Sequence, residues 1–155
     1  SHVDVHPDVW RTTRPASSDS AHLFIKAVQT WERNAGGDES KTTDRASAST
    51  QFIWRLRRAF FHDCQNIALR SVQCEVAEQV GIPRAAVEAE IDSGAAFAAL
   101  ASDAQDRERL KLEGSPTFVL NQGRQKLYGN LGYRVIEANI RELLRTPGAN
   151  EMSWC

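Results

Sequence analysis

Apolar side chains recur every three or four residues through much of the first two-thirds of the chain. This spacing places them on one face of a helix and predicts a series of amphipathic helices. A side-chain oxygen of Ser18 or Asp19 is expected to cap the first of them, and Gly81 and Pro83 end one helix and begin the next. The polar stretch 34–50, rich in glycine, serine and threonine, predicts a loop. The helices are expected over residues 19–33, 51–61, 68–80, 83–91 and 95–112.

The first residues carry only a weak strand pattern. Val3 and Val5 alternate with polar residues, which allows a short strand, and Pro7 ends it. Pro15 and the serines that follow it predict a loop.

The pattern changes at residues 114–116, whose Gly-Ser-Pro sequence predicts a turn because proline fixes φ and has no N–H to donate. Residues 117–120 and 125–128 suit short strands, and the Asn-Gln-Gly-Arg run between them is typical of a turn. Together they predict an antiparallel hairpin. A last amphipathic helix is expected to end before Pro147 and Gly148, with these residues on its apolar face: Val135, Ile136, Ile140, Leu143 and Leu144.

Composition narrows the class of protein. A chain of 155 residues is expected to form one domain with a sizeable core, and 41% apolar with 25% charged residues is ordinary for a globular protein. The net charge of −1 gives no electrostatic footprint for nucleic acid or an anionic membrane. No apolar run approaches the roughly 18 residues that a membrane span needs. The chain shows no signal-peptide pattern and begins with Ser1, so we expect a processed or trimmed chain.

The second predicted helix, over residues 51–61, contains three arginines: Arg55, Arg57 and Arg58. They suggest either an acidic partner or a solvated face. The balanced charge around them favours the solvated face.

The cysteines are sparse and odd in number: Cys64, Cys74 and Cys155. This count favours a reducing compartment, so we expect a cytoplasmic protein rather than a disulfide scaffold. Cys74 lies in an apolar helix and is expected to be buried and inert. His62 and Cys64 are two candidate ligands or a nucleophile fragment, but two residues do not make a site, and no metal site is predicted. Cys155 is expected to be an accessible thiol without a catalytic role.

Residues 114–145 are predicted to follow the order turn, strand, turn, strand, glycine and helix. Both this order and the residues that form it are informative. The run Gly114–Asn121 resembles the cis-proline loop and following strand of the DsbA-like thiol–disulfide oxidoreductases. The run Tyr128–Tyr133 resembles the Gly-x-x-x-Tyr approach to their last helix, and the stretch from Pro15 to His22 is similar to the entry of their helical insertion. The resemblance points to the branch with FrnE-like dithiol isomerases, 2-hydroxychromene-2-carboxylate isomerase and kappa-class glutathione transferases.

This resemblance implies an α/β, thioredoxin-like fold with a large all-helical insertion. Residues 1–155 would form a single DsbA-like domain, with the insertion over about 19–113 and a closing hairpin and helix over about 114–145. Family members carry Cys-x-x-Cys, or a variant with serine, in an opening β-α-β unit. The 155 residues contain no Cys-x-x-Cys, so the opening unit is expected to be absent from this chain and no catalytic residue is assigned.

The resemblance also implies a substrate-binding loop at Ser115, Pro116 and Thr117. The Ser115–Pro116 bond is expected to be cis, with Ser115 at the specificity position and its amide and carbonyl paired with an extended substrate. Trp10 and Phe24 would line a groove beneath the helical roof. His22 is a weaker candidate for substrate binding. For His6 and His22, packing or capping is the alternative interpretation, and for Trp10 and Phe24 it is a place in the core or at its rim.

Three functions remain open. The first is a protein thiol–disulfide oxidoreductase that acts on protein thiols or disulfides. The second is a non-catalytic peptide-binding or chaperone module, and the third is an isomerase or transferase that uses glutathione, the one small cosubstrate implied. A frame without its opening unit leaves a sheet edge uncovered. We expect a partner chain, a swapped homodimer, or residues Val3–Val5 acting as a substitute strand to cover it.

Overall fold

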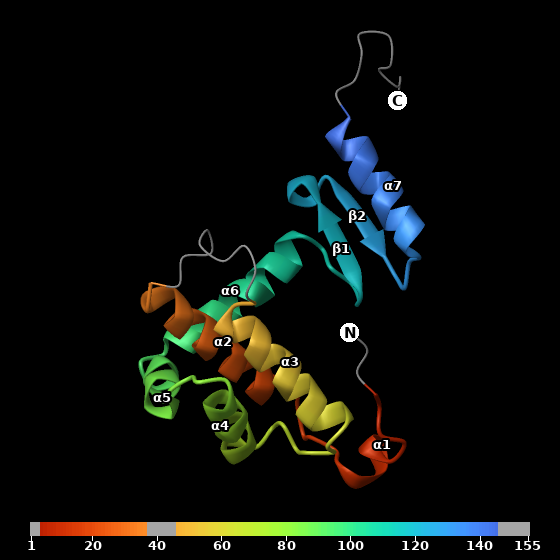
Figure 1. Ribbon diagram of the computed structural model, residues 1–155. Helices are drawn as coiled ribbons and strands as arrows, with labels where there is room; N and C mark the ends of the chain where they lie inside the picture. The colour runs from red at the N-terminus through yellow and green to blue at the C-terminus, as the bar shows by residue number, and fades with distance from the viewer. Residues whose placement is uncertain (1–3, 37–45, 146–155) are drawn as a thin grey trace, which may run out of the picture. The chain divides into compact units, whose positions relative to one another are not determined.

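The computed structural model describes residues 4–36 and 46–145. These residues are mostly helical, with one small antiparallel sheet of two strands (Figure 1). The chain divides into two compact units, 1–104 and 105–155, and the boundary falls inside α6. In chain order the elements are α1 (Val9–Thr12), α2 (Asp19–Asn34), α3 (Ala48–Phe61), α4 (Arg70–Gln79), α5 (Arg84–Asp92), α6 (Ala95–Arg109), β1 (Thr117–Leu120), the 3-10 turn η1 (Asn121–Gly123), β2 (Gln125–Tyr128) and α7 (Tyr133–Leu144).

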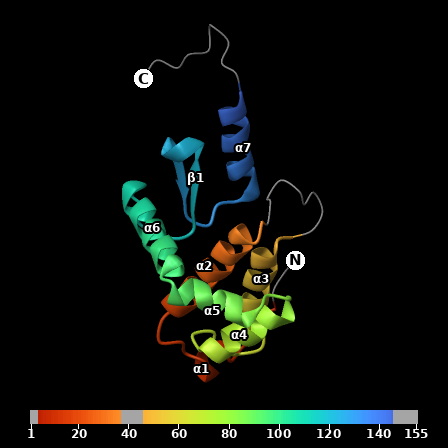
Figure 2. The ribbon, with the colours of Figure 1, turned by 90° about the vertical axis from the view of Figure 1, so that its left-hand side faces the viewer.

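The helix α2 is the centre of the first unit, because α3, α4 and α5 all pack against it. Helices α4 and α5 adjoin each other, as Figures 1 and 2 both show. The apolar faces meet in a single core. Its buried members are Ala21, Phe24, Ala27, Val28, Phe52, Leu56, Ala59, Cys74, Val76, Ala77, Ile82, Val87 and Ala96.

The helices predicted from apolar spacing are confirmed, with small shifts at their ends. Helix α3 begins at Ala48 rather than at residue 51, because acceptors for its free N–H groups come from two places. Ser47 Oγ accepts from the amide of Thr50 at 3.2 Å. The carboxylate of Glu32, on α2, accepts from the amides of Ala48 at 2.6 Å and Ser49 at 3.3 Å. One helix thus caps another.

The expected cap of α2 by Ser18 or Asp19 is wrong. Ser18 precedes the helix but its side chain makes no capping bond. The hydroxyl of Ser17, one residue earlier, accepts from the amide of Asp19 at 3.0 Å instead. The stop after α4 is as expected: Gly81 takes a positive φ of 79°, and the amide of Ile82 then returns to the carbonyl of Ala77 at 3.0 Å.

The first described residues do not form the substitute strand. Residues 4–6 are irregular and Val5 is exposed, while Val3 lies outside the described residues. The amide of His6 instead donates to the carbonyl of Phe61 at 2.7 Å, which ties this segment to the end of α3. The predicted Val3–Val5 strand is therefore wrong where the structure describes it.

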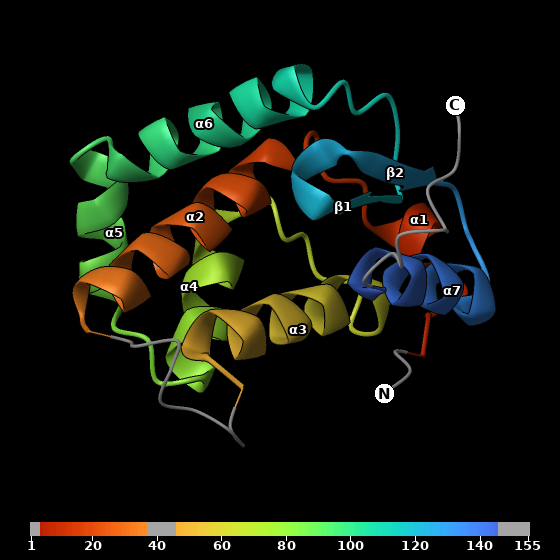
Figure 3. The same cartoon turned by 90° about the horizontal axis from the view of Figure 1, so that it is seen from above.

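In the second unit, β1 and β2 pair antiparallel with Phe118 opposite Leu127 and Leu120 opposite Gln125. These four side chains share one face of the sheet, because successive residues of a strand point to opposite faces. Helix α7 lies along that face (Figure 3), and Gln125 Nε2 donates to Asn139 Oδ1 across the contact. The predicted hairpin and final helix are confirmed.

The second unit has little interior. None of the side chains between residues 105 and 145 is fully buried. On α7 the apolar residues Val135, Ile140 and Leu143 are 46%, 41% and 37% exposed, and Leu144 is 78% exposed. The prediction that a partner covers this surface stays a prediction, as does the grouping of 1–155 into one domain. The boundary at 104/105 falls within the predicted insertion.

Among the described helices, none combines the length and hydropathy that a bilayer crossing requires. The residues 37–45 of the predicted loop, and Pro147 and Gly148, lie outside the described part of the chain.

Candidate functional site

The loop before β1 has the backbone geometry expected for it. The peptide bond between Ser115 and Pro116 is cis, which confirms the prediction for this bond. Pro116 and Ser115 are both exposed, and Thr117 begins β1 half-buried. The loop therefore presents two consecutive residues to solvent at the start of a strand.

Two hydrogen bonds fix this loop from either side of Ser115. The hydroxyl of Thr117 donates to the carbonyl of Gly114 at 2.6 Å. The amide of Gly129, just after β2, donates to the carbonyl of Pro116 at 2.9 Å. The residues that flank Ser115 are thus tied down by their own chain, so the conformation at Ser115 is held without any bond of its own.

A close packing contact explains the glycine of the loop. A Cβ atom on Gly114 would lie 2.7 Å from the ring of Tyr128, which is nearer than real Cβ atoms approach. The ring of Tyr128 rests where any other side chain would begin. Sequence reasoning placed Tyr128 in the second strand and in the run that leads to the last helix, and it missed this contact. The signal available was the pairing of the first residue of one strand with the last of the other, which places Tyr128 opposite Thr117.

The backbone of Ser115 is the chemically available part of the loop. Its amide and carbonyl form no hydrogen bond with any residue in 4–36 or 46–145. Both groups belong to an exposed residue, so neither has to be paired within the chain. An extended backbone laid beside Ser115 could supply a donor and an acceptor to them, which is the contact used when a peptide adds to a strand.

The weaker site candidates lie in the first unit, and the structure gives each a different environment. Trp10 is 60% exposed, with its ring edge-on to Phe60 at 4.9 Å and to Phe61 at 6.5 Å. His22 is exposed in the first turn of α2, and its amide donates to the carbonyl of Ser18 at 3.0 Å. For Trp10 and His22, a role in substrate binding stays a prediction.

Phe24 has no surface to offer a ligand. Its side chain is 0% exposed, its ring lies 5.3 Å from that of Phe52, and the guanidinium of Arg70 lies 5.2 Å over its face. These contacts support the core interpretation for Phe24 over the groove interpretation.

The His62–Cys64 fragment does not assemble into a site. His62 Nδ1 and Asp63 Oδ1 pair at 2.5 Å, both half-exposed. The carbonyl of Cys64 accepts from the hydroxyl of Thr13, and Cys64 has a positive φ of 52°. Across the part of the chain that the structure describes, no three His, Cys, Asp or Glu side chains gather as metal ligands would.

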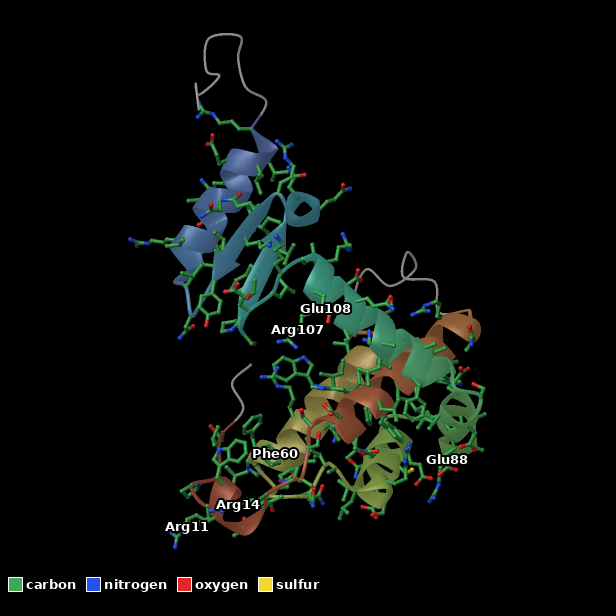
Figure 4. The ribbon with its side chains drawn as sticks, turned by 180° about the vertical axis from the view of Figure 1, so that it is seen from behind. Arg11, Arg14, Phe60, Glu88, Arg107 and Glu108 are labelled. Atoms are coloured by element: carbon green, nitrogen blue, oxygen red, sulfur yellow. The ribbon has the colours of Figure 1, made fainter. Side chains whose placement is uncertain are left out.

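Cys74 is 2% exposed, as expected. Burial raises the pKa of its thiol above the ordinary value, the nearby Arg84 lowers it, and the Glu88 carboxylate raises it further. The thiol lies 3.9 Å from Glu88 Oε1 and donates toward it, while Arg84 Nε donates to the same oxygen at 2.9 Å. Glu88 is labelled on α5 in Figure 4. A thiol that stays protonated in the core is a poor nucleophile.

We expect iodoacetamide at about pH 8 to alkylate Cys74 at least about tenfold more slowly than Cys64 in the folded protein, because the attacking species is the thiolate. Trypsin separates the two in peptides 59–70 and 71–84, so mass spectrometry reads each rate. In concentrated urea the two rates should become equal. Equal rates in the folded protein would show that Cys74 is neither buried nor raised in pKa.

Comparison with known proteins gives one clear match. A family model for the DSBA-like thioredoxin domain matches residues 41–141, well over half of the chain. The matched part runs from before α3 through the loop at Ser115 and the hairpin into α7. No curated protein sequence matches the chain.

Proposed function

Since the chain belongs to the DSBA-like thioredoxin domain family, we propose that it provides the substrate-binding part of a protein thiol–disulfide oxidoreductase. In this function the loop at Ser115 and Pro116 holds an extended segment of a protein substrate while its disulfide exchanges. The runs Gly114–Asn121 and Tyr128–Tyr133 favour the FrnE-like branch of the family. Its relatives there include 2-hydroxychromene-2-carboxylate isomerase and kappa-class glutathione transferases.

The observation that carries this proposal is the state of the Ser115 backbone. Its N–H and C=O belong to an exposed residue and form no bond within the described ranges, and the residues on either side are both held by hydrogen bonds. A preorganised donor and acceptor lower the entropic cost of binding an extended chain. Backbone pairing also suits an enzyme that must accept many sequences, because every peptide offers the same amides.

Exchange itself requires a reactive dithiol. A thiolate attacks one sulfur of the substrate disulfide, a mixed S–S bond forms, and the second substrate sulfur leaves as a thiolate. A resolving thiolate then attacks the enzyme sulfur of the mixed disulfide, which closes the enzyme disulfide and releases the first substrate sulfur as a thiolate. The cysteines of the 155 residues are Cys64, Cys74 and Cys155, and no two stand three positions apart. The dithiol is therefore a part of the reaction that these residues do not supply. An oxidoreductase predicts a Cys-x-x-Cys unit in the complete gene product.

The same absence of Cys-x-x-Cys favours a second candidate, a non-catalytic peptide-binding or chaperone module. It predicts binding of extended peptides and a complete gene product that also lacks the dithiol. The third candidate, a glutathione-dependent isomerase or transferase, would use the Ser115 backbone for the glutathione peptide. Titration with glutathione separates it from the second, because only the third candidate binds the tripeptide.

We expect Ser115→Pro to weaken binding of an extended peptide by about tenfold, because proline removes the amide donor and keeps the carbonyl. The probe is fluorescein-labelled insulin B chain with alkylated cysteines, measured by fluorescence polarisation, so that no disulfide contributes.

The matched control is Ser115→Ala, which removes the hydroxyl and keeps both backbone groups. It should bind within about twofold of the unchanged protein. Circular dichroism of both variants checks the fold. An equal loss in both variants would assign the contact to the hydroxyl, and an equal affinity in all three proteins would remove the loop from the binding site.

A further inference from the structure

One side of α3 displays aromatic and cationic side chains together. Trp54, Arg57, Arg58 and Phe61 lie within about a quarter-turn to a third of the helix circumference, because three- and four-residue steps return to the same face. Trp54, Arg57 and Arg58 are exposed and Phe61 is half-buried. We call these four residues, with Trp10 at their C-terminal end, the α3 stripe.

Arg57 is ordered without the use of its hydrogen-bond donors. Its guanidinium lies over the ring of Trp54, 5.4 Å from the centroid. Cation–π attraction holds the guanidinium over the ring, and none of its N–H groups is bonded within the described ranges, so they remain available for a carboxylate. The contact with Trp54 therefore limits the freedom of Arg57 before a ligand binds and lowers the entropic cost of binding.

No carboxylate in the described ranges forms an ion pair with the arginines of the stripe. Neither Arg57 nor Arg58 forms an ion pair with a carboxylate in the described ranges, and the same holds for Arg55 beside them. Elsewhere the chain does pair exposed arginines within a helix, as Arg141 does with Glu137 at 2.6 Å. The positive charge on this side of α3 is thus left open to an outside partner.

Trp10 gives the stripe a fixed aromatic end. Its ring packs edge-on against Phe60 and Phe61, and Phe60 extends from α3 toward the segment that carries Arg11 and Arg14 (Figure 4). Arg14 Nε donates to the carbonyl of Trp10 at 2.9 Å, which closes this short segment on itself. Trp10 nevertheless keeps 60% of its surface exposed. Tryptophan and arginine are the residue types enriched among the residues that contribute most to binding at protein interfaces.

We propose that the α3 stripe is a docking site for an acidic segment of another protein. Carboxylates of that segment pair with Arg57 and Arg58, and an apolar side chain between them packs on Trp54 or Trp10. Charge complementarity selects this occupant. A nucleic acid is disfavoured because the chain carries a net charge of −1 and the cationic part of the stripe spans about one helical turn. The inference is independent of the loop at Ser115.

The test uses the full 155-residue chain and a fluorescein-labelled decapeptide of aspartate and glutamate with one central leucine. Fluorescence polarisation is measured at about 0.15 M salt, where distant charges are screened. Arg58→Glu should weaken binding by at least about tenfold. Trp54→Ala should weaken it by a similar factor, because Arg57 then loses the ring over which its guanidinium lies. Arg57→Lys, which keeps the charge and loses the planar fork, should give an intermediate loss.

The matched control is Arg134→Glu, the same charge reversal at an exposed helical arginine outside α3. It should change the affinity by no more than about twofold. Equal losses for Arg134→Glu and Arg58→Glu would overturn the inference, since general electrostatics would then explain the binding. It would also be overturned if the chain failed to bind the acidic peptide, or bound a single-stranded oligonucleotide more tightly. A change of oligomeric state in Arg58→Glu, read by sedimentation, would make a second copy the occupant and overturn it too.

Discussion

Replacing Phe52 by alanine lowers the free energy of unfolding of the helical unit by about 3–5 kcal/mol. Phe52 is 0% exposed and its ring lies 5.3 Å from that of Phe24, so the two rings join α3 to the central helix α2. Truncation removes the transfer free energy of the ring and leaves a cavity that rigid neighbouring helices close only in part. A urea titration followed by circular dichroism measures the change.

The matched control for this prediction is Phe97→Ala, the same substitution in the part of α6 that belongs to the same unit. Phe97 is 54% exposed, so its loss should cost less than about 1 kcal/mol. Similar losses for the two substitutions would contradict the core that the structure describes, because burial would then not distinguish them.

Replacing Glu32 by alanine lowers the free energy of unfolding by about 1–3 kcal/mol, since two amides at the start of α3 lose a charged acceptor. The carboxylate accepts from Ala48 at 2.6 Å and Ser49 at 3.3 Å. It also lies at the positive end of the α3 dipole, which favours a negative charge there. Ser47 caps only the amide of Thr50 and cannot replace it.

Glu75→Ala is the comparison for Glu32→Ala, because Glu75 is exposed on α4 and the alanine is favourable in a helix. Its effect should lie within about 0.5 kcal/mol of zero. Helix content near α3, measured by hydrogen exchange of the amides of Ala48 and Ser49, should fall only in the Glu32 variant. Unchanged protection of those amides would show that Glu32 is not their acceptor.

The cap by Glu32 also shows where reasoning from sequence stops. Apolar spacing located the helices because each buried stripe repeats within its own segment. It missed the true start of α3, since the capping carboxylate belongs to another helix 16 positions away along the chain. Only the packed structure brings Glu32 and Ala48 together. For α2, the residue types of Ser17 and Ser18 likewise do not tell that Ser18 makes no capping bond while Ser17 accepts from the amide of Asp19.

Apolar spacing likewise did not predict which side chains in and next to α4 are buried. Leu69 lies in the range 68–80 that apolar spacing predicts as a helix, yet it precedes α4 and is 52% exposed. Gln73 is 0% exposed; its Nε2 donates to the carbonyl of Ile67 at 2.7 Å and to the hydroxyl of Ser20 at 3.0 Å, while its Oε1 is buried without a partner among the described residues. The two bonds of the amide nitrogen offset part of the cost of burying this side chain, and partners from other segments cannot be read from the sequence.

The loop at Ser115 was the most predictable part of the candidate site. Its turn, strands and cis bond follow from the Gly-Ser-Pro run and the resemblance carried by the residues around it. Two features of the loop could not be predicted without the pairing of β1 with β2: the contact of the Tyr128 ring with Gly114, and the unpaired backbone of Ser115. This pairing decides which residues of the two strands lie opposite each other. The amphipathic character of α7 could be predicted from its apolar spacing, whereas the exposed fractions of its apolar side chains required the packed structure.

The direct test of the binding loop is a nuclear magnetic resonance titration of the uniformly labelled chain with alkylated insulin B chain. The account predicts that the amide signals of Ser115 and Thr117 shift first and furthest, and that Gly129, bonded to the carbonyl of Pro116, shifts with them. Saturable binding that leaves these three amides unmoved, while signals elsewhere shift, would contradict it.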